Sequence, residues 1–266
     1  MNDLKKRLPL LLYLMLLVAA CGGKESVLLE IDFSEAPSWL YLLGADLRGA
    51  VECEDSSQAY SGSLRAYLQG AGSSTKESAQ FKTKDFTIKS DFLTDGQMFE
   101  LENRLSVLEI AVSPTEGVSV SDTAIASAIP LANWDILRSV ARAIPVLPAS
   151  KMSVGASWER EYQFPIETNQ GQVTGQLYQI FRLDSIITKN ANPSRAILSW
   201  LFSYRVSLDH INSVVGDLPM SGSGVGNAVI DLKKNRLIKT NANFEMSYQD
   251  RCNIQLKETV HLELIE

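Results

Sequence analysis

Hydrophobic and polar residues alternate along several segments of the chain, which predicts β-strands. The clearest cases are 197–208, 237–248 and 252–266, where apolar residues fill one face and mostly polar residues the other. Glu258 is a charged residue on the apolar face of the last segment. Strands of this kind are typical of antiparallel sheets with one face in water. The predicted strands are 26–33, 42–53, 59–68, 79–92, 97–102, 106–113, 156–165, 172–187, 197–208, 224–232, 237–248 and 252–266.

Short polar links between these segments predict hairpins and a meander, because parallel strands need longer crossover connections. We interpret Gly222-Ser223-Gly224 as a glycine-rich turn that leads into a strand, and 113–130 as an irregular connection. Turn-forming residues lie at Asp95-Gly96, 169–171, 189–193 and 234–235.

One segment follows a helical pattern instead. Trp134, Leu137, Ala141 and Ile144 recur at steps of three and four residues, which predicts a helix over 131–144. After this helix, 151–158 is expected to re-enter the sheet. The predicted fold is therefore mainly β, with a minor helical part. It is a curved antiparallel sheet or open half-barrel with one helix packed on its concave face.

The composition is that of an ordinary globular protein. Of 266 residues, 45 % are hydrophobic and 21 % are charged, and 25 Lys and Arg against 31 Asp and Glu give a net charge of -6. This balance excludes a disordered chain, a collagen-like chain and a polytopic membrane protein. Binding to a phosphate backbone needs clustered basic residues, so we expect no nucleic-acid partner.

The first residues have the features of a processing signal. A basic group at 5–7 precedes an apolar run at 8–20 that is too short to span a bilayer as a mature helix. The run ends in Val18-Ala19-Ala20-Cys21, which resembles the lipobox of bacterial lipoproteins. The resemblance implies cleavage between Ala20 and Cys21, a diacylglyceryl group on the Cys21 thiol and an acyl chain on the new N-terminus. The alternative is an ordinary secretory signal followed by a chance cysteine.

This resemblance sets the expected domains and location. Residues 1–20 are the signal peptide, 21–25 are the lipidated cysteine with a short polar tether, and 26–266 form a single β-rich periplasmic domain. In enterobacterial lipoproteins an Asp after the cysteine favours the inner membrane. Residue 22 is Gly, so the expected location is the cell envelope, at the outer membrane facing the periplasm. Apart from the lipid on Cys21, we expect no cofactor.

Cys53 and Cys252 remain after lipidation of Cys21. Exported chains meet an oxidising compartment, so an even pair predicts a disulfide between them. Each cysteine also lies on the inward face of a predicted strand, together with apolar residues. The alternative is two buried free thiols.

A second resemblance covers the C-terminal half. The motifs Val154-Gly155-Ala156-Ser157-Trp158 and Gly222-Ser223-Gly224, with the hairpin around Asp231 and Asn235, look like those of uncharacterised exported bacterial lipoproteins. Asn235 stands where those proteins more often have Gly. The resemblance implies a β-rich periplasmic body and no activity.

Catalytic patterns are weak. Neither His210 nor His261 has further ligands at metal-binding spacing, so we expect solvated histidines and no metal. The run 222–226 lacks the spacing of a nucleophile elbow or a phosphate loop. Glu52 with Glu54, or Glu159 with Glu161, are the carboxylate pairs of a hydrolase alternative.

Aromatic residues at inner positions leave two interpretations open. They are either an ordinary packed core or the wall of a cavity for a lipid or another hydrophobic ligand. The residues expected to line such a cavity are Trp134, Leu137, Ile144, Trp200, Phe202, Tyr204, Phe244 and Met246.

These observations predict a membrane-anchored envelope lipoprotein that acts as a non-enzymatic binding or structural module. Its expected partners are the membrane, through the lipid, and a hydrophobic small molecule or an envelope protein. The first alternative is a carrier of lipid in a cavity between sheet and helix. The second is the hydrolase.

Overall fold

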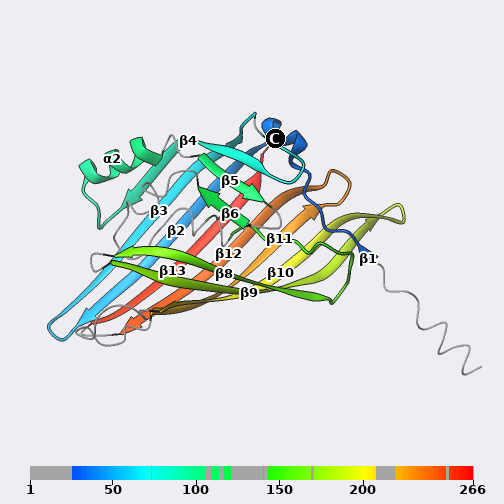
Figure 1. Ribbon diagram of the computed structural model, residues 1–266. Coiled ribbons are helices and arrows are strands. Elements are labelled where there is room, and N and C mark those ends of the chain that lie inside the picture. Colours follow the sequence, from blue (N-terminus) through cyan, green and yellow to red (C-terminus); the bar gives the residue numbers. More distant parts are fainter. Residues whose placement is uncertain are drawn as a thin grey trace, which may run out of the picture.

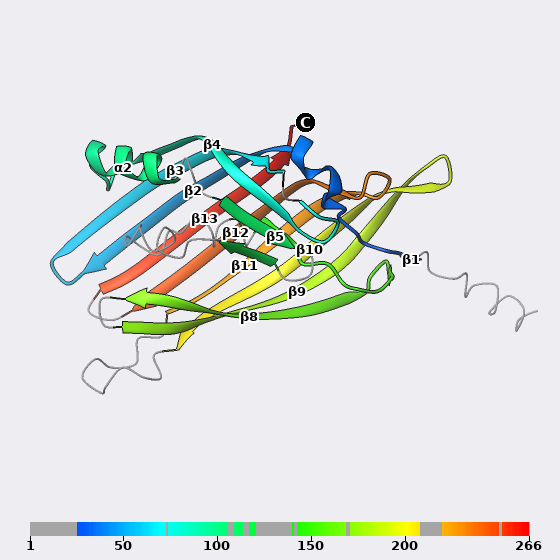
Figure 2. The same ribbon diagram turned by 45° about the horizontal axis from the view of Figure 1, so that its top comes forward.

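A computed structural model of the chain describes residues 26–72, 74–105, 109–113, 117–120, 140, 143–168, 171–207, 220–249 and 252–265. Eleven strands form one antiparallel sheet in the order β6-β5-β4-β3-β2-β13-β12-β11-β10-β9-β8. The sheet is strongly curved and does not close, because β6 and β8 are its two edges. Figures 1 and 2 show the half-barrel that results. The predicted architecture, a mainly β open half-barrel, is confirmed.

The ends of most predicted strands lie within a few residues of the observed ends. The predictions succeed because each strand has one face in the core. In β2, for example, Tyr41, Leu43, Ala45 and Leu47 are buried inside the half-barrel. The large sheet consists of β2 (Leu40–Cys53), β3 (Ser56–Gly70), β4 (Ala79–Ser90), β5 (Glu109–Ser113), β6 (Gly117–Val120), β8 (Ser157–Thr168), β9 (Gly171–Lys189), β10 (Asn192–Ser207), β11 (Met220–Asp231), β12 (Arg236–Gln249) and β13 (Cys252–Leu264).

Hairpins join neighbouring strands at two ends of the sheet. At the β9–β10 turn, Asn190 and Ala191 adopt positive φ angles of 55° and 62°, and Asn235 in the β11–β12 turn has φ 45°. The left-handed pair Asn190-Ala191 matches the twist of antiparallel strands, and Asn tolerates this conformation well at both turns. The predicted turns at 189–193 and 234–235 are confirmed. Of the predicted turn at 169–171, residues 169 and 170 lie outside the described residues.

The predicted disulfide is present. Cys53 ends β2 and Cys252 begins β13, and the two residues face each other across these adjacent strands with Cα atoms 4.3 Å apart. The bond joins positions 199 residues apart in sequence. We call the end of the sheet where this bond lies, next to the β2–β3 hairpin, the disulfide end.

The turn predicted at Gly222-Ser223-Gly224 is wrong, because these residues lie inside β11. Gly222, Gly224 and Gly226 lie on its inner face, opposite aromatic residues of β10. The register pairs Gly226 with Trp200 and Gly224 with Phe202, and these rings lie over the glycine backbone. Glycine is required here because any side chain would occupy the space of the rings.

We expect Gly224→Ala to lower the free energy of unfolding by about 3 kcal/mol, at the upper end for overpacked cores. A Cβ at this position would overlap with the backbone carbonyl oxygen of Asn243 and with the Phe202 ring. Urea denaturation measures the loss. Gly96→Ala is the matched control, because a Cβ there meets no atom within 4 Å. Equal midpoints for both variants would contradict this account of the glycines.

The segment predicted as a strand at 97–102, after a turn at Asp95-Gly96, is instead the helix α2 (Asp95–Leu105). Leu101 and Leu105 are buried beside β4, and the Glu102 carboxylate accepts a hydrogen bond from the backbone N–H of Ile88 at 2.9 Å. β5 pairs only with β4 residues 79–82. The helix therefore covers the part of the β4 edge that does not pair with β5.

The predicted strand 26–33 is largely wrong. Only β1 (Ser26–Val27) is a strand, and it pairs with β7 (Met152–Ser153) in a separate small sheet. The segment 151–158, expected to re-enter the large sheet, does so at Ser157, where β8 begins. We call residues 28–39, which include the short 3-10 helix η1 (Phe33–Ser38), the strap. Its backbone bonds to two different hairpins, through Asp32 N–H to Asn235 and Phe33 N–H to Lys76. The end of the sheet crossed by the strap is the strap end.

The predicted helix 131–144 lies mostly outside the described residues. Its last part is described at Val140, Ala143 and Ile144, which are buried, and the Ile144 N–H donates to the Val140 carbonyl with helical spacing. The Thr240 hydroxyl of β12 donates to the Ala143 carbonyl, so this part lies against the inner face of the sheet. The segment 113–130, predicted to be irregular, contains β6.

Candidate functional site

The inner face of β9–β12 is lined with aromatic and aliphatic side chains. Trp200, Phe202, Phe244 and Met246, all predicted to line a cavity, are buried there. The Phe202 and Phe244 rings stack with centroids 5.7 Å apart. Of the other predicted lining residues, Tyr204 is described only in its backbone within β10, Trp134 and Leu137 lie outside the described residues, and Ile144 lies at the strap end.

Three hydrogen-bond donors interrupt this apolar wall on neighbouring strands. They are Arg160 Nε of β8, Gln179 Nε2 of β9 and Trp200 Nε1 of β10, and none has an acceptor within the described part of the chain. We call these three residues the donor triad. Three further buried side-chain atoms without a partner are scattered elsewhere, on Trp39, Tyr60 and Arg236.

The strand register places the donor triad on one face of three neighbouring strands, with the Trp200 indole nitrogen over Gly226 on the β11 side. Arg160 and Gln179 are directly opposite each other, which places Cβ atoms about 5 Å apart. Gln179 faces Phe202, and Phe181 faces Trp200, so Gln179 and Trp200 are diagonal neighbours on the same face. Trp158, two residues before Arg160, stacks on Phe181 at 5.5 Å, which confirms the inward direction of that face.

Leaving these donors unpaired costs stability. A buried donor without an acceptor loses about 1–3 kcal/mol relative to its hydrated state. Gln179 is only 1 % exposed, so water does not solvate it freely. Buried polar groups in folded proteins normally have partners, and exceptions point to strain or to a bound group. The donor triad is therefore chemically suited to an oxygen acceptor, and Arg160 favours an anionic one.

The sequence analysis missed the donor triad, although a signal was present. Gln179 occupies an inner position between Leu177 and Phe181, and Arg160 follows Trp158 at the same period of two. Polar residues at apolar positions of an alternating strand are the exceptions that need a reason.

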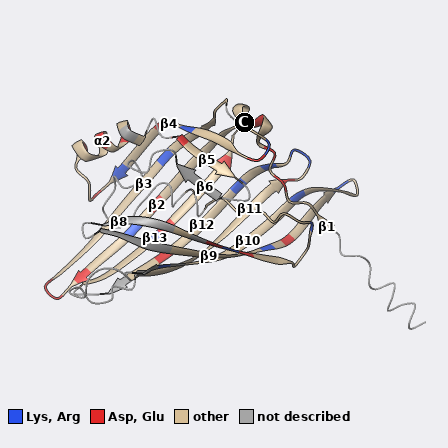
Figure 3. Cartoon of the chain, viewed as in Figure 1, with Lys and Arg blue, Asp and Glu red and all other residues tan. Residues whose placement is uncertain are grey.

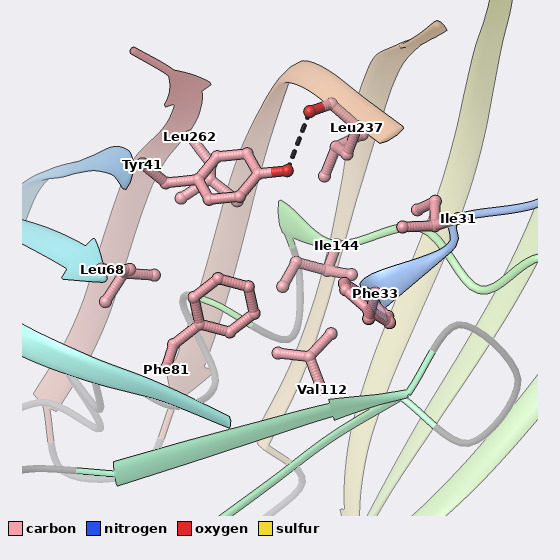
Figure 4. A pocket seen from close by; sticks show the side chains of 9 residues that line it. All are labelled: Ile31, Phe33, Tyr41, Leu68, Phe81, Val112, Ile144, Leu237 and Leu262. Carbon is pink, nitrogen blue, oxygen red and sulfur yellow. Dashed lines mark hydrogen bonds between the residues drawn. The ribbon is translucent and has the colours of Figure 1, made fainter. Parts of the chain in front are cut away.

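A second feature is a small apolar cavity at the strap end. It leaves about 20 Å³ for the centre of a water-sized molecule. Figure 4 shows its side chains converging from the strap, the sheet and the segment that ends in Ile144. The lining residues are Ile31, Phe33, Tyr41, Leu68, Phe81, Val112, Ile144, Leu237 and Leu262.

The strap forms the outer wall of this cavity. The Phe33 ring lies 5.6 Å from Trp39 and 6.3 Å from Phe81, and Tyr41 lies 5.8 Å from Phe81. The Tyr41 hydroxyl donates to the Leu237 carbonyl at 2.9 Å. Burial raises the pKa of this hydroxyl well above its ordinary value, against a smaller lowering by Arg236, so it remains a donor at neutral pH.

Among the described residues, the residues proposed for catalysis do not form a buried or enclosed site. Glu52, Glu54, Glu159 and Glu161 are all exposed. His261 lies over Gly44 on the outer face, and His210 lies outside the described residues. Among the described residues no group of three or more His, Cys, Asp or Glu could hold a metal ion. No described helix is both long and apolar enough to cross a membrane.

Comparison with known proteins gives distant structural likenesses. No protein-family model and no curated protein matches the chain. DynF from the dynemicin biosynthesis pathway of Micromonospora chersina has 7 % identity and a TM-score of 0.21 over 90 % of this chain and 85 % of that one. A domain assigned as an outer membrane lipoprotein-sorting protein of Vibrio parahaemolyticus has 10 % identity and a TM-score of 0.19, over 85 % and 83 %. Backbones with TM-scores this low do not transfer a function, so function is inferred below from the residues themselves.

Proposed function

We propose that the protein binds an anionic amphiphile on the inner face of its half-barrel, and that it does so as a lipid-anchored protein of the bacterial envelope. The observation that carries this proposal is the donor triad, three N–H groups without an acceptor on an otherwise apolar wall. A ligand with one oxyanion group and an apolar body supplies the missing acceptor and also suits the apolar wall. Fatty acids and acidic lipids belong to this chemical class.

The two parts of such a ligand would meet different residues. Its carboxylate or phosphate oxygens accept from Arg160 and Gln179, which are directly opposite each other, and charge-assisted bonds of this kind are the stronger ones. Phe181 and Phe202 on this wall are nearly fully buried, so the hydrocarbon part reaches them only when the side chains that cover them move aside. Each buried CH₂ contributes about 0.8 kcal/mol.

The envelope location rests on the lipobox-like end of the signal at Ala20 and Cys21. Two or three acyl chains on Cys21 would hold the folded domain at a membrane. A binding protein held there has direct access to amphiphiles, which concentrate in bilayers.

A fluorescent fatty acid, cis-parinaric acid, tests the proposal on the purified full chain in mild detergent. We expect saturable binding that Arg160→Met weakens by at least about 30-fold, which corresponds to about 2 kcal/mol, the lower end for truncating a buried charged contact. Arg182→Met is the matched control, because Arg182 is exposed on β9 and pairs with Asp184 at 3.6 Å. The methyl ester of the probe lacks the anion and should bind the unaltered protein as weakly as the acid binds Arg160→Met.

Gln179→Leu separates binding from folding. It removes a buried donor without a partner and retains the approximate volume, so we expect the ligand-free variant to be more stable by about 1 kcal/mol. Its affinity for cis-parinaric acid should nevertheless fall. Thermal unfolding without the probe and titration with it measure the two effects. Absence of probe binding by the unaltered protein, or equal affinities for Gln179→Leu and the unaltered protein, would overturn the proposal.

A further inference from the structure

Lysines gather at the strap end of the sheet, around the β9–β10 and β11–β12 hairpins. The side chains of Lys189, Lys233 and Lys234 are exposed there, and exposed Lys151 lies just before β7. We call these four residues the basic rim. The two hairpins are neighbours, because Leu232 N–H donates to the Ser194 carbonyl at 3.0 Å. Figure 3 shows the blue segments at these turns.

The basic rim is free to meet a partner. No ion pair joins any of its four side chains to a described acidic residue. Of the acidic neighbours, Asp231 and Glu30 are engaged, whereas Glu35 of the strap and Glu77 beside Lys76 are exposed. The Asp231 carboxylate accepts from the backbone N–H groups of Lys233 and Lys234 at 2.9 and 3.1 Å. Glu30 of the strap pairs with Lys76 at 2.8 Å.

The disulfide end carries the opposite charge. Glu52, Glu54 and Asp55 are exposed at the β2–β3 hairpin. Figure 3 shows red segments at this tip of the sheet, away from the strap. The hairpin tips at the two ends of the sheet therefore differ in charge, with lysines at β9–β10 and β11–β12 and carboxylates at β2–β3.

Exposed apolar side chains accompany the basic rim. Leu28, which follows β1, is 45 % exposed, Val154 after β7 is 38 % exposed and Ile187 in β9 is 44 % exposed. β1 pairs with β7, and Gly155 N–H donates to the Leu183 carbonyl of β9 at 2.7 Å. These contacts place Leu28 and Val154 close to the same side of the strap end as the hairpins. Apolar residues beside lysines are typical of surfaces that enter a lipid interface.

Chain length places this surface at a membrane if Cys21 is lipidated. Five peptide steps separate Cys21 from Ser26, and a fully extended chain spans at most about 3.5 Å per residue. The start of β1 therefore lies within about 17 Å of the lipid.

We propose that the basic rim, with Leu28, Val154 and Ile187, docks on the anionic headgroups of the bilayer. The strap and its apolar cavity then face the lipid, and the acidic disulfide end points away. This inference rests on the proposed envelope location, and it names the bilayer as the source of the ligand.

Amine footprinting tests the orientation on the full lipidated chain in vesicles. The vesicles contain phosphatidylcholine alone or with 30 % phosphatidylglycerol, and acetylation of each lysine is measured by mass spectrometry. We expect at least fivefold protection of the basic rim on the anionic vesicles, and its loss in 0.5 M salt because screening is then strong. Lys89, exposed on β4, is the internal control and should react equally on both. Equal reactivity of Lys233 and Lys89 would overturn the proposal.

If Cys21 is not lipidated, a soluble form of the chain still tests whether the basic rim docks on anionic lipid. The chain from residue 21 with Cys21→Ser retains every described residue. Near a charged membrane each lysine changes affinity about fivefold, so K233Q with K234Q should lower the partition onto the anionic vesicles about 25-fold. Lys89→Gln should leave it unchanged. Equal partition of the two variants would contradict docking by the basic rim, whatever the state of Cys21.

Discussion

Cys21→Ser is expected to abolish incorporation of a labelled fatty acid into the protein in the native cell. The thiol of Cys21 is the attachment point that the lipobox resemblance implies, and serine does not accept the diacylglyceryl group. Metabolic labelling with a palmitate analogue measures the effect. Cys53→Ser is the matched control, because it removes a different cysteine and should leave the label in place.

A second measurement follows the location of the same protein. Residues 22–266, exported behind an ordinary cleavable signal, should lose at least 100-fold of membrane retention in high salt, because two or more acyl chains supply stable anchoring and salt removes electrostatic docking. Persistent labelling of the Cys21→Ser protein would refute the anchor. Retention of the truncated protein in high salt would refute it as well.

Loss of the Cys53–Cys252 bond is expected to be the most destabilising covalent change in the folded domain. The bond joins residues 199 positions apart, so it removes many open conformations from the unfolded chain. We expect Cys53→Ala with Cys252→Ala to lower the free energy of unfolding by about 2–5 kcal/mol, or the melting temperature by about 10 °C in a domain of this size.

Calorimetry under non-reducing conditions measures this loss. Each single variant should lose about as much as the double variant, because either one removes the whole bond. Reduction of the unaltered protein by dithiothreitol should lower its melting temperature to that of the double variant. An unchanged melting temperature in the double variant would show that the pairing of β2 with β13 suffices without the bond.

Alternation of apolar and polar residues was enough to predict the large sheet. Segments such as 197–208 and 237–248 have one face in the core and one in water, and only a strand has that period of two. The disulfide was also predictable, since two cysteines remain once Cys21 is assigned to the proposed lipobox of an exported chain. Their inward faces agreed with the final register.

The errors arose where a local pattern depends on distant partners. Residues 26–33 alternate, and Leu29, Ile31 and Phe33 are buried as expected. Their backbone nevertheless bonds to two hairpins far along the chain, so the segment is a strap and not a sheet strand. The glycines of β11 looked like a turn because the aromatic rings that require them come from another strand, β10.

The functional residues divide in the same way. The lipobox-like motif that ends in Cys21, on which the proposed anchor rests, the strand pattern and the pair of cysteines were visible in the chain alone, because each depends on neighbouring residues or on residue count. The grouping of the donor triad and of the basic rim was not, although single polar residues at inner positions were, because pairing between strands decides which polar side chains meet. Arg160, Gln179 and Trp200 are spread over 41 residues, and antiparallel pairing of β8, β9 and β10 brings them to one patch of the inner wall.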